Sequence, residues 1–246
     1  MDNKTVIITG ASRGIGKATA EQFCREGWNV LVNYLKSEKE AFELQAVLEK
    51  KGTGAVELFR ADVSKRTEVD MMVAHCIERF GGVDVLVNNA GISRQTLFTD
   101  ISSYEWDELM DVNLKGVFNC CQSVLSLMLR RKSGRIINVS SIWGLVGASC
   151  EVHYSAAKAA VIGLTRALAK ELGPSNIQVN CVCPGIIKTD MNNHLSANDI
   201  QDLEYATPLM RLGTPQDVSQ CIYFLASPEA SFFTGQILSP NGGFVI

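Results

Sequence analysis

The sequence lacks the features that mark several common classes of protein. No apolar run approaches the roughly 20 residues that a membrane-spanning helix needs, so we expect no membrane insertion. Lys and Arg together number 23 and Asp and Glu 26, and the formal charge of −3 gives no reason to expect nucleic-acid binding. The opening residues MDNKTVIITGAS do not have the charged, apolar and small-residue order of a signal peptide, and we therefore expect a cytoplasmic protein.

Spacings typical of metal sites are absent as well. The eight cysteines are most simply free thiols in a reducing cytosol, because neither Cys120-Cys121 nor Cys181-x-Cys183 has the spacing of a metal site. Cys181 and Cys183 alternate along a predicted strand and should face the same side of a sheet. The three histidines are not at ligand spacing either, and we predict no metal: His75, His153 and His194. His153 is expected to lie at most on the rim of a substrate site.

What the chain does contain is a repeated alternation of strands and helices. Short apolar runs predict strands at 5–9, 29–34, 55–60, 83–87, 135–140, 177–182 and 236–239. Helical patterns lie between them, at 17–27, 37–51, 67–80, 104–131, 152–172 and 214–226. No linker or low-complexity segment interrupts the pattern. We therefore predict one α/β domain over residues 1–246, a Rossmann-type doubly wound parallel sheet of about seven strands with helices on both faces.

A glycine-rich turn follows the first strand. Gly10-Ala-Ser12-Arg13-Gly14-Ile15-Gly16 joins that strand to the first helix. Glycines there allow a tight turn and let a pyrophosphate approach the backbone N–H groups of the helix N-terminus. The alternative is a purely structural βα turn; the flanking strand and helix favour dinucleotide binding.

The second strand ends without the acid that usually holds an NAD ribose. Its end reads Asn33-Tyr34-Leu35-Lys36-Ser37. Lys36 and Arg13 could pair with a 2′-phosphate instead, which favours NADP(H) over NAD(H).

Polar or small residues also follow the next two strands. The third strand is followed by Asp62-Val63, where the Asp62 carboxylate could accept a hydrogen bond from an adenine amino group or could cap the following helix. Asn88-Asn89-Ala90-Gly91 suits a wall against which a cofactor lies, or forms an ordinary turn.

The strongest chemical signal lies between Ser141 and Lys158. Ser141 follows the fifth strand, and Tyr154 and Lys158 are one turn apart on a predicted helix. Ser141 could hold a substrate oxygen while Tyr154 gives or takes its proton, and the lysine ammonium should lower the pKa of the tyrosine. Tyr-x-x-x-Lys alone occurs by chance in many helices, but the nucleotide signals above reverse those odds.

Two further features need a reason. Asn113 lies inside a long helical pattern, where asparagine is unfavourable, and so indicates a buried hydrogen bond, a bound water or simple exposure. The excursion 186–213, after the sixth strand and Pro184-Gly185, has the length and position of a substrate loop.

Taken in order, these motifs resemble the short-chain dehydrogenase/reductase family over the whole chain. The resemblance implies a catalytic tetrad of Asn113, Ser141, Tyr154 and Lys158, in which Lys158 also binds the nicotinamide ribose and Asn113 holds a water for proton relay. It further implies cofactor contacts from several loops: Ser12, Arg13, Ile15, Asp62, Val63, Asn89, Ile187 and Thr189. The cofactor would supply hydride, and the protein would supply position and a proton.

Within that family the chain most resembles bacterial 3-oxoacyl-acyl-carrier-protein reductases, as in GASRGIG, VDVLVNNAGIS, GRIINVSS, 187–191 and the closing NGGFVI. Arg130-Arg131-Lys132 lies where those enzymes have a basic patch for the acidic carrier protein, although such a cluster also suits any solvated helix C-terminus. A second arginine that those enzymes often have is missing from the turn 173–176. A homotetramer, with its interfaces on the helices 104–131 and 152–172, is expected from the resemblance alone.

The stretch around Trp143 and Glu151 also resembles a subgroup that reduces a 5-aminopentanone group on elongation factor P. Glu151 precedes Tyr154 by one turn and could pair with a cationic amine in a small pocket with Trp143; alternatively, it caps the catalytic helix. Three hypotheses follow: a reductase of 3-oxoacyl thioesters, a reductase of that aminoketone, and a non-catalytic NADP(H) sensor or scaffold. The intact Ser141, Tyr154 and Lys158 favour an enzyme.

Overall fold

The computed structural model describes residues 3–51, 54–190 and 196–246. Its strands are β1 (Thr5–Ile8), β2 (Asn29–Tyr34), β3 (Val56–Arg60), β4 (Val85–Asn88), β5 (Gly134–Val139), β6 (Ile177–Val182) and β7 (Ile237–Leu238). Its helices are α1 (Gly14–Arg25), α2 (Glu38–Lys51), α3 (Arg66–Phe80), α4 (Ser103–Met110), α5 (Gly116–Arg131), α6 (Trp143–Val146), α7 (Val152–Leu172), α8 (Ala197–Ala206) and α9 (Pro215–Ala226).

The strands form one parallel sheet in the order β3-β2-β1-β4-β5-β6-β7. The chain begins at β1, extends to β3 on one side and then returns to β4 on the other side of β1. The sheet therefore has a topological switch point between β1 and β4, where such folds bind ligands at the carboxyl ends of the strands. The predicted doubly wound α/β fold is confirmed.

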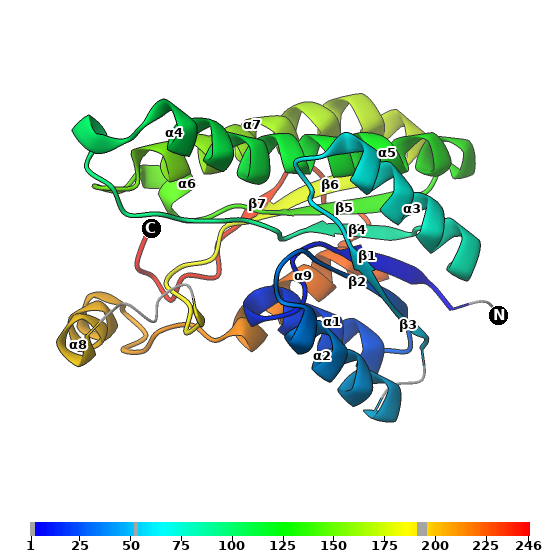
Figure 1. The fold of residues 1–246 in the computed structure, drawn as a ribbon, viewed down its shortest axis with the longest axis horizontal. Helices are drawn as coiled ribbons and strands as arrows, with labels where there is room; N and C mark the ends of the chain where they lie inside the picture. The colour runs from blue at the N-terminus through cyan, green and yellow to red at the C-terminus, as the bar shows by residue number, and fades with distance from the viewer. Residues whose placement is uncertain (1–2, 52–53, 191–195) are drawn as a thin grey trace.

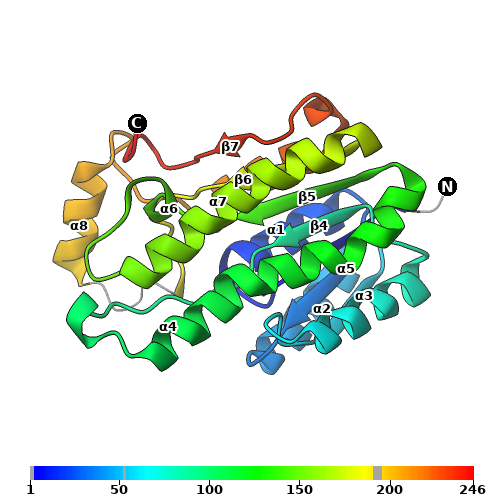
Figure 2. The same cartoon turned by 90° about the horizontal axis from the view of Figure 1, so that it is seen from above.

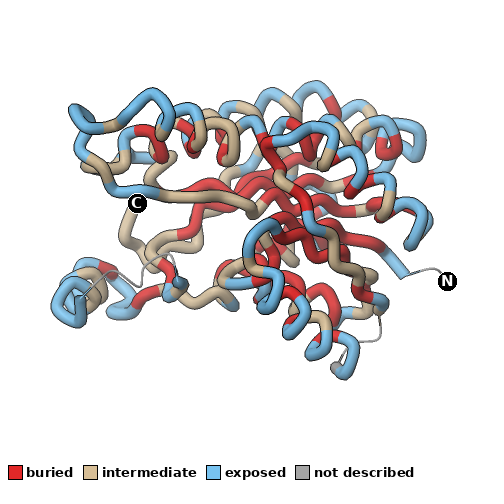
Figure 3. Tube along the Cα trace, viewed as in Figure 1, coloured by how far each residue is buried: buried red, intermediate tan, exposed pale blue. Residues whose placement is uncertain are grey.

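Helices cover both faces of the sheet, and each face has its own core (Figure 1). On one face α3, α5 and α7 pack over a cluster that includes Ile7 and Ile136; on the other, α1, α2 and α9 pack over one that includes Val6 and Ile8. Neighbouring residues of β1 thus belong to opposite cores. This burial on both faces explains the continuous apolar runs in the sequence, and it makes the strands the most buried part of the chain (Figure 3).

The long helical pattern predicted over 104–131 consists of three consecutive parts. Ser102 and Glu105 form a capping box that starts α4, and α5 continues the same direction to Arg131. Between them, Asp111–Lys115 is a π-helical segment with Asn113 at its centre. In Figure 2, α4 and α5 together run alongside α7. Such π segments inside α-helices frequently occur at functional sites.

The predicted loop 186–213 leaves the sheet and returns to the same place. Ile187 pairs with Gly213 in an isolated bridge, and the Lys188 N–H donates to the Gly213 carbonyl at 2.9 Å. The segment contains α8, which a capping box at Ser196 begins. Residues 191–195, which include Met191 and His194, lie outside the described residues. None of the helices in the described parts of the chain is both long enough and apolar enough to cross a membrane.

Candidate active site

A cavity of about 710 Å³ lies at the carboxyl edge of the sheet. It gathers residues that are far apart in the sequence, from the loops after β1 to β6. Among the residues named from the sequence, those that line it are Gly10, Ser12, Arg13, Gly14, Ile15, Lys36, Asp62, Val63, Asn89, Ala90, Gly91, Ser141, Tyr154, Lys158, Pro184, Gly185, Ile187 and Thr189. Of the residues predicted to act in catalysis or to bind cofactor or substrate, Gly16, Asn113, Trp143 and Glu151 do not line it.

The glycine turn is fitted closely against the loop after β4. Gly10 has a φ of 60°, and a Cβ there would lie 2.9 Å from the Ala90 Cα. A Cβ on Gly16 would lie 2.5 Å from the Gly10 carbonyl oxygen and 2.6 Å from the Asn89 Nδ2. The Asn89 amide in turn donates to the Thr9 and Gly10 carbonyls at 2.9 and 3.0 Å. Gly16 does not line the cavity; because it has no side chain, the first turn of α1 can pack directly against the glycine turn and Asn89.

One end of the cavity has the character expected for a phosphorylated ribose. Arg13, Lys36 and Lys65 line it, and all three side chains are exposed. Asn33 accepts from the Gly10 N–H at 3.1 Å and donates to the Ala61 carbonyl at 3.0 Å, so it ties the glycine turn to the loop after β3. The absence of an acid at the end of β2 is visible in the sequence, but the hydrogen bonds of Asn33 could not be predicted from it.

Of the two interpretations of Asp62, helix capping is wrong. The N-cap residue of α3 is Lys65, and Asp62 instead accepts from the Ser64 N–H at 2.9 Å and from the Ser64 hydroxyl at 2.7 Å. Asp62 thereby shapes the turn at the cavity wall.

Ser141, Tyr154 and Lys158 meet at the other end of the cavity, and all three are largely buried. Ser141 lies two residues beyond the end of β5, and its Oγ accepts from the Trp143 N–H at 3.1 Å. Tyr154 and Lys158 project from α7, with the lysine Nζ 5.6 Å from the centre of the tyrosine ring. The same Nζ donates to the Val139 carbonyl at 2.9 Å.

The pKa of Tyr154 is not lowered as the sequence suggested. Burial raises the pKa of Tyr154 well above its usual value; the Ser141 hydroxyl opposes this through a hydrogen bond, while the charge of Glu151 adds to it. Burial also lowers the pKa of Lys158 to about 8. The tyrosine is thus held as a neutral phenol, the form that can donate a proton.

Asn113 satisfies the buried hydrogen bond that its position indicated. It is fully buried; its Oδ1 accepts from the Ile92 N–H at 2.9 Å, and its Nδ2 donates to the Ile92 carbonyl at 2.8 Å. The side chain therefore clamps the loop after β4 to the π-helical segment beside the cavity. Gly91 adapts to this arrangement, since a Cβ there would lie 2.7 Å from the Asn113 Oδ1.

The residues around the start of α7 differ from the expectations in two ways. Glu151 occupies the N-cap position but makes no capping hydrogen bond; its carboxylate accepts from the Ser93 hydroxyl at 3.3 Å. His153 is completely buried, so the predicted place at a substrate rim is wrong. Trp143 packs in the small apolar cluster that contains Tyr154, and its ring lies 6.0 Å from that of Phe244.

Carboxylates line the cavity wall that α4 and the π segment form. Asp107, Glu108 and Asp111 all contribute to it, whereas no Lys or Arg of residues 103–115 does. Arg94, outside the lining, lies 2.8 Å from Glu108. This acidic wall was not predicted from the sequence, because α4 contacts α7, the helix of Tyr154 and Lys158, only in the folded chain.

The basic cluster Arg130-Arg131-Lys132 lies at the opposite edge of the sheet. It ends α5, immediately before β5 begins at Gly134, whereas Ser141 follows the other end of β5. Arg131 is also engaged there, donating to the Gly81 carbonyl at 2.7 Å. In this chain the cluster does not adjoin the cavity.

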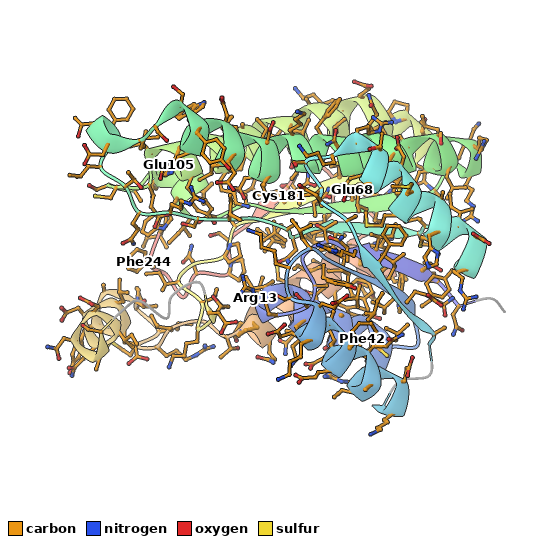
Figure 4. All side chains as sticks on the ribbon, in the orientation of Figure 1. Arg13, Phe42, Glu68, Glu105, Cys181 and Phe244 are labelled. Atoms are coloured by element: carbon orange, nitrogen blue, oxygen red, sulfur yellow. The ribbon has the colours of Figure 1, made fainter. Side chains whose placement is uncertain are left out.

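Within the described residues, no group of three or more His, Cys, Asp or Glu side chains is placed to hold a metal ion. All eight cysteines are free thiols, as predicted. Cys181 and Cys183 do face the same side of the sheet, with their sulfur atoms 3.9 Å apart. Figure 4 labels Cys181 at the sheet, under the helical layer that contains α7.

The fold and this cavity define a dinucleotide-dependent oxidoreductase, and comparison with known proteins agrees. A family model described as Enoyl-(Acyl carrier protein) reductase matches residues 10–245. The 3-oxoacyl-acyl-carrier-protein reductase FabG of Staphylococcus epidermidis is 47% identical over 244 residues, covering 98% of each chain. FabG of Staphylococcus aureus is 44% identical over 240 residues, covering 98% of this chain and 97% of the relative. A 3-oxoacyl-acyl-carrier-protein reductase of Synechocystis is 44% identical over 244 residues, covering 99% and 97%.

The chain belongs to the short-chain dehydrogenase/reductase family and is an NADP(H)-dependent oxidoreductase. The residues present fit that coenzyme. The cavity extends from the cations Arg13 and Lys36 to Ser141 and Lys158, and the backbone around Gly10 and Gly16 has no room for side chains beneath it. When bound, the nicotinamide supplies or accepts hydride.

Proposed function

We propose that this protein reduces the keto group of 3-oxoacyl thioesters carried by acyl-carrier protein, at the expense of NADPH. The observation that carries the proposal is the meeting of Ser141, Tyr154 and Lys158 at one end of a cavity whose other end is cationic. High identity to three reductases named for this substrate supports the choice of thioester.

In the proposed reaction, the Ser141 hydroxyl holds the substrate carbonyl oxygen and Tyr154 donates a proton to it as the carbon is reduced. The raised pKa of Tyr154 keeps that proton in place until the oxygen becomes basic. Lys158 holds the nicotinamide ribose and stabilises the phenolate that remains. Asn113 keeps Ile92 and the π segment in place and, as the family resemblance implies, a water for proton relay beside them. We assign the remaining cofactor contacts to those residues, predicted from the sequence to bind the cofactor, that line the cavity.

The main test is a Tyr154→Phe variant assayed by NADPH oxidation with an acetoacetyl thioester. Removing the general acid should lower kcat by about 10²- to 10⁴-fold, while NADPH binding stays nearly unchanged. Comparable NADPH consumption by the variant would exclude Tyr154 as the proton donor.

Reduction of a carbonyl on a cationic, amine-bearing substrate, such as the 5-aminopentanone group of elongation factor P, is the second candidate function. The carboxylates of Asp107, Glu108 and Asp111 on the cavity wall favour it; of these, Glu108 and Asp111 are also paired with Arg94 and Lys115 outside the lining. Glu151 does not line the cavity, but its charge acts on Tyr154. The basic cluster Arg130-Arg131-Lys132 lies at the far edge of the sheet. It therefore does not support the binding of an acidic carrier protein next to this chain's own cavity.

The two candidates are separated by assaying an acetoacetyl thioester and a short aminoketone in parallel. If the amine is recognised by Glu151, Glu151→Gln should lower kcat/KM for the aminoketone about tenfold and leave the thioester rate unchanged. Equal kcat/KM values for the aminoketone with and without the Glu151 carboxylate would exclude an amine-binding pocket of Glu151 and Trp143.

We further propose that the chain is one cytoplasmic domain, that 186–213 is its substrate loop, and that it works as a homotetramer. Exposed apolar side chains on the proposed interface helices support the assembly: Phe118 of α5 is 45% exposed and Leu129 is 42% exposed. Sedimentation of the purified protein measures the assembly, and a monomer at micromolar concentration would exclude it.

A further inference from the structure

Lys158 is a buried ammonium group that is only 3% exposed. Its Nζ donates to the neutral Val139 carbonyl, which does not compensate its charge. Among the described residues, none of the ion pairs within 4.0 Å involves Lys158. Burying an unpaired charge is costly, and buried charges in proteins are usually compensated by a neighbouring group.

Two thiols that the proposed chemistry does not use lie beside it. Cys181 on β6 and Cys183, the residue directly after its end, are fully buried, and their sulfur atoms are 3.9 Å apart, within the range of an S–H···S hydrogen bond. Both belong to the core on the α7 face, together with Val161 and Ile162 of α7. They therefore lie between the sheet and the helix that carries Lys158.

The register of the sheet brings the second thiol next to the catalytic residues. Asn138 pairs with Cys181, and Val139 with Val182; continuing this parallel register sets Ser140 beside Cys183. The Ser140 N–H donates to the Val182 carbonyl at 2.8 Å, which agrees with this placement.

Ser140 also connects the thiol to the catalytic helix. Its hydroxyl donates to the backbone carbonyl of Lys158 at 2.7 Å. Ser140 thus links the end of the strand beside Cys183 to the backbone of Lys158.

The electrostatics of the cluster agree with its geometry. The hydrogen bond from Cys181 lowers the pKa of Cys183 and the same bond raises the pKa of Cys181, so the pair gives up one proton more readily than two. Both sulfurs also raise the pKa of Lys158, against the effect of burial. The other titratable group facing the cluster is Tyr154, on which Cys183 and Glu151 both act.

We propose that Cys181 and Cys183 are positioning residues, a hydrogen-bonded pair that holds one thiolate and serves as the buried counter-charge of the Lys158 ammonium. In this state the two sulfurs share one proton and carry one negative charge, and the Lys158 amine stays protonated and positively charged. The consequence for catalysis rests on the role proposed above for Lys158, but the charge state of the pair can be measured without a substrate.

The first experiment follows the ultraviolet absorbance of thiolate in the whole protein as the pH rises. We expect one thiolate per chain already formed more than about one pH unit below the ordinary cysteine pKa of about 8.5. Cys183→Ala should abolish this early signal, and Lys158→Met should move it upward by about one unit or more. Cys120→Ala, which removes another buried core thiol of the same cluster, is the matched control and should leave the signal unchanged. Absence of an early thiolate in the wild type, or an early thiolate that Lys158→Met does not shift, overturns the proposal.

The second experiment measures the pH profile of kcat/KM for NADPH-dependent reduction. Without the counter-charge, Lys158 should lose its proton at lower pH, so the alkaline limb of the Cys181→Ala/Cys183→Ala variant should move down by about half a unit or more. Cys183→Ser keeps a polar group and should restore part of the shift. An unmoved limb in a variant that still binds NADPH normally overturns the proposal. Failure of the thioester as a substrate would refute the proposed function alone, since the thiolate titration needs no substrate.

Discussion

Replacing Gly16 by Ala tests how closely the glycine turn, the loop after β4 and the start of α1 are fitted together. The new methyl group would lie 2.5 Å from the Gly10 carbonyl oxygen, 2.6 Å from the Asn89 Nδ2 and 2.8 Å from the Ala11 Cα. The Asn89 amide cannot swing aside without breaking its hydrogen bonds to Thr9 and Gly10. The start of α1 must therefore move, and with it the backbone that faces the coenzyme.

Overpacking of this kind costs about 1–3 kcal/mol. If that cost falls on the folded state, Tm should drop by about 2–12 °C for a chain of this size. If it falls instead on the coenzyme-binding geometry, the Kd for NADPH should rise about 5- to 150-fold. Thermal unfolding and calorimetric titration with NADPH, performed on the same sample, measure both.

Gly163→Ala is the matched control for this variant. Gly163 lies on the exposed side of α7, and a Cβ there meets nothing within 4 Å. Because alanine favours a helix by about 0.5–1 kcal/mol over glycine, the control should keep its NADPH affinity and gain slightly in Tm. A Gly16→Ala protein whose Kd and Tm both match those of the control would refute the proposed close fit.

Two further predictions concern single charges. Lys36→Ala should raise the KM for NADPH about tenfold and leave that for NADH nearly unchanged, since only NADPH has the 2′-phosphate. Lys39→Ala is its control, because Lys39 is exposed at the start of α2 and lies outside the cavity lining. Equal effects of Lys36→Ala on both coenzymes would contradict the assignment. Asp217 accepts from Arg211 at 2.7 Å and from the Thr214 N–H at 2.8 Å, and these partners hold its pKa well below the usual range. The stabilisation is therefore complete above the unfolded pKa of about 3.9 and is lost as the pH falls through the lower folded value. The Tm of Asp217→Asn should fall below that of the wild type at pH 7, and the difference should narrow progressively as the pH falls below about 3.9. A difference that stays constant between pH 7 and the lowest pH at which the protein is folded would show that the charge is irrelevant.

Much of the fold could be predicted from the sequence because its signals are local. The strand over 29–34 and the helix over 152–172 have the predicted bounds, since apolar runs and helical periodicity depend only on neighbouring residues. The same holds for Gly10, Ser141, Tyr154 and Lys158, which follow strand ends in order and meet at one edge of the sheet because all its strands are parallel.

Other features depended on which elements pack together, and no local pattern contains that information. His153 neighbours Tyr154 in sequence, yet it is fully buried, and Glu151 stands at a helix start but accepts a hydrogen bond from Ser93. The pKa of Tyr154 is raised because burial outweighs the Ser141 hydrogen bond, and only the packed core sets the degree of burial.

The sequence by itself determined the class of fold and the order of its elements, and it singled out the residues proposed to react, because each follows from residue types at short spacing. The tertiary structure alone decided that the basic cluster at Arg130 ends at the far edge of the sheet, and that Asp107 and its neighbours face the cavity. It also decided that Cys181 and Cys183 come together in the core between the sheet and α7. These outcomes arise from sheet register and helix packing, which join residues dozens of positions apart and therefore leave no trace in local sequence.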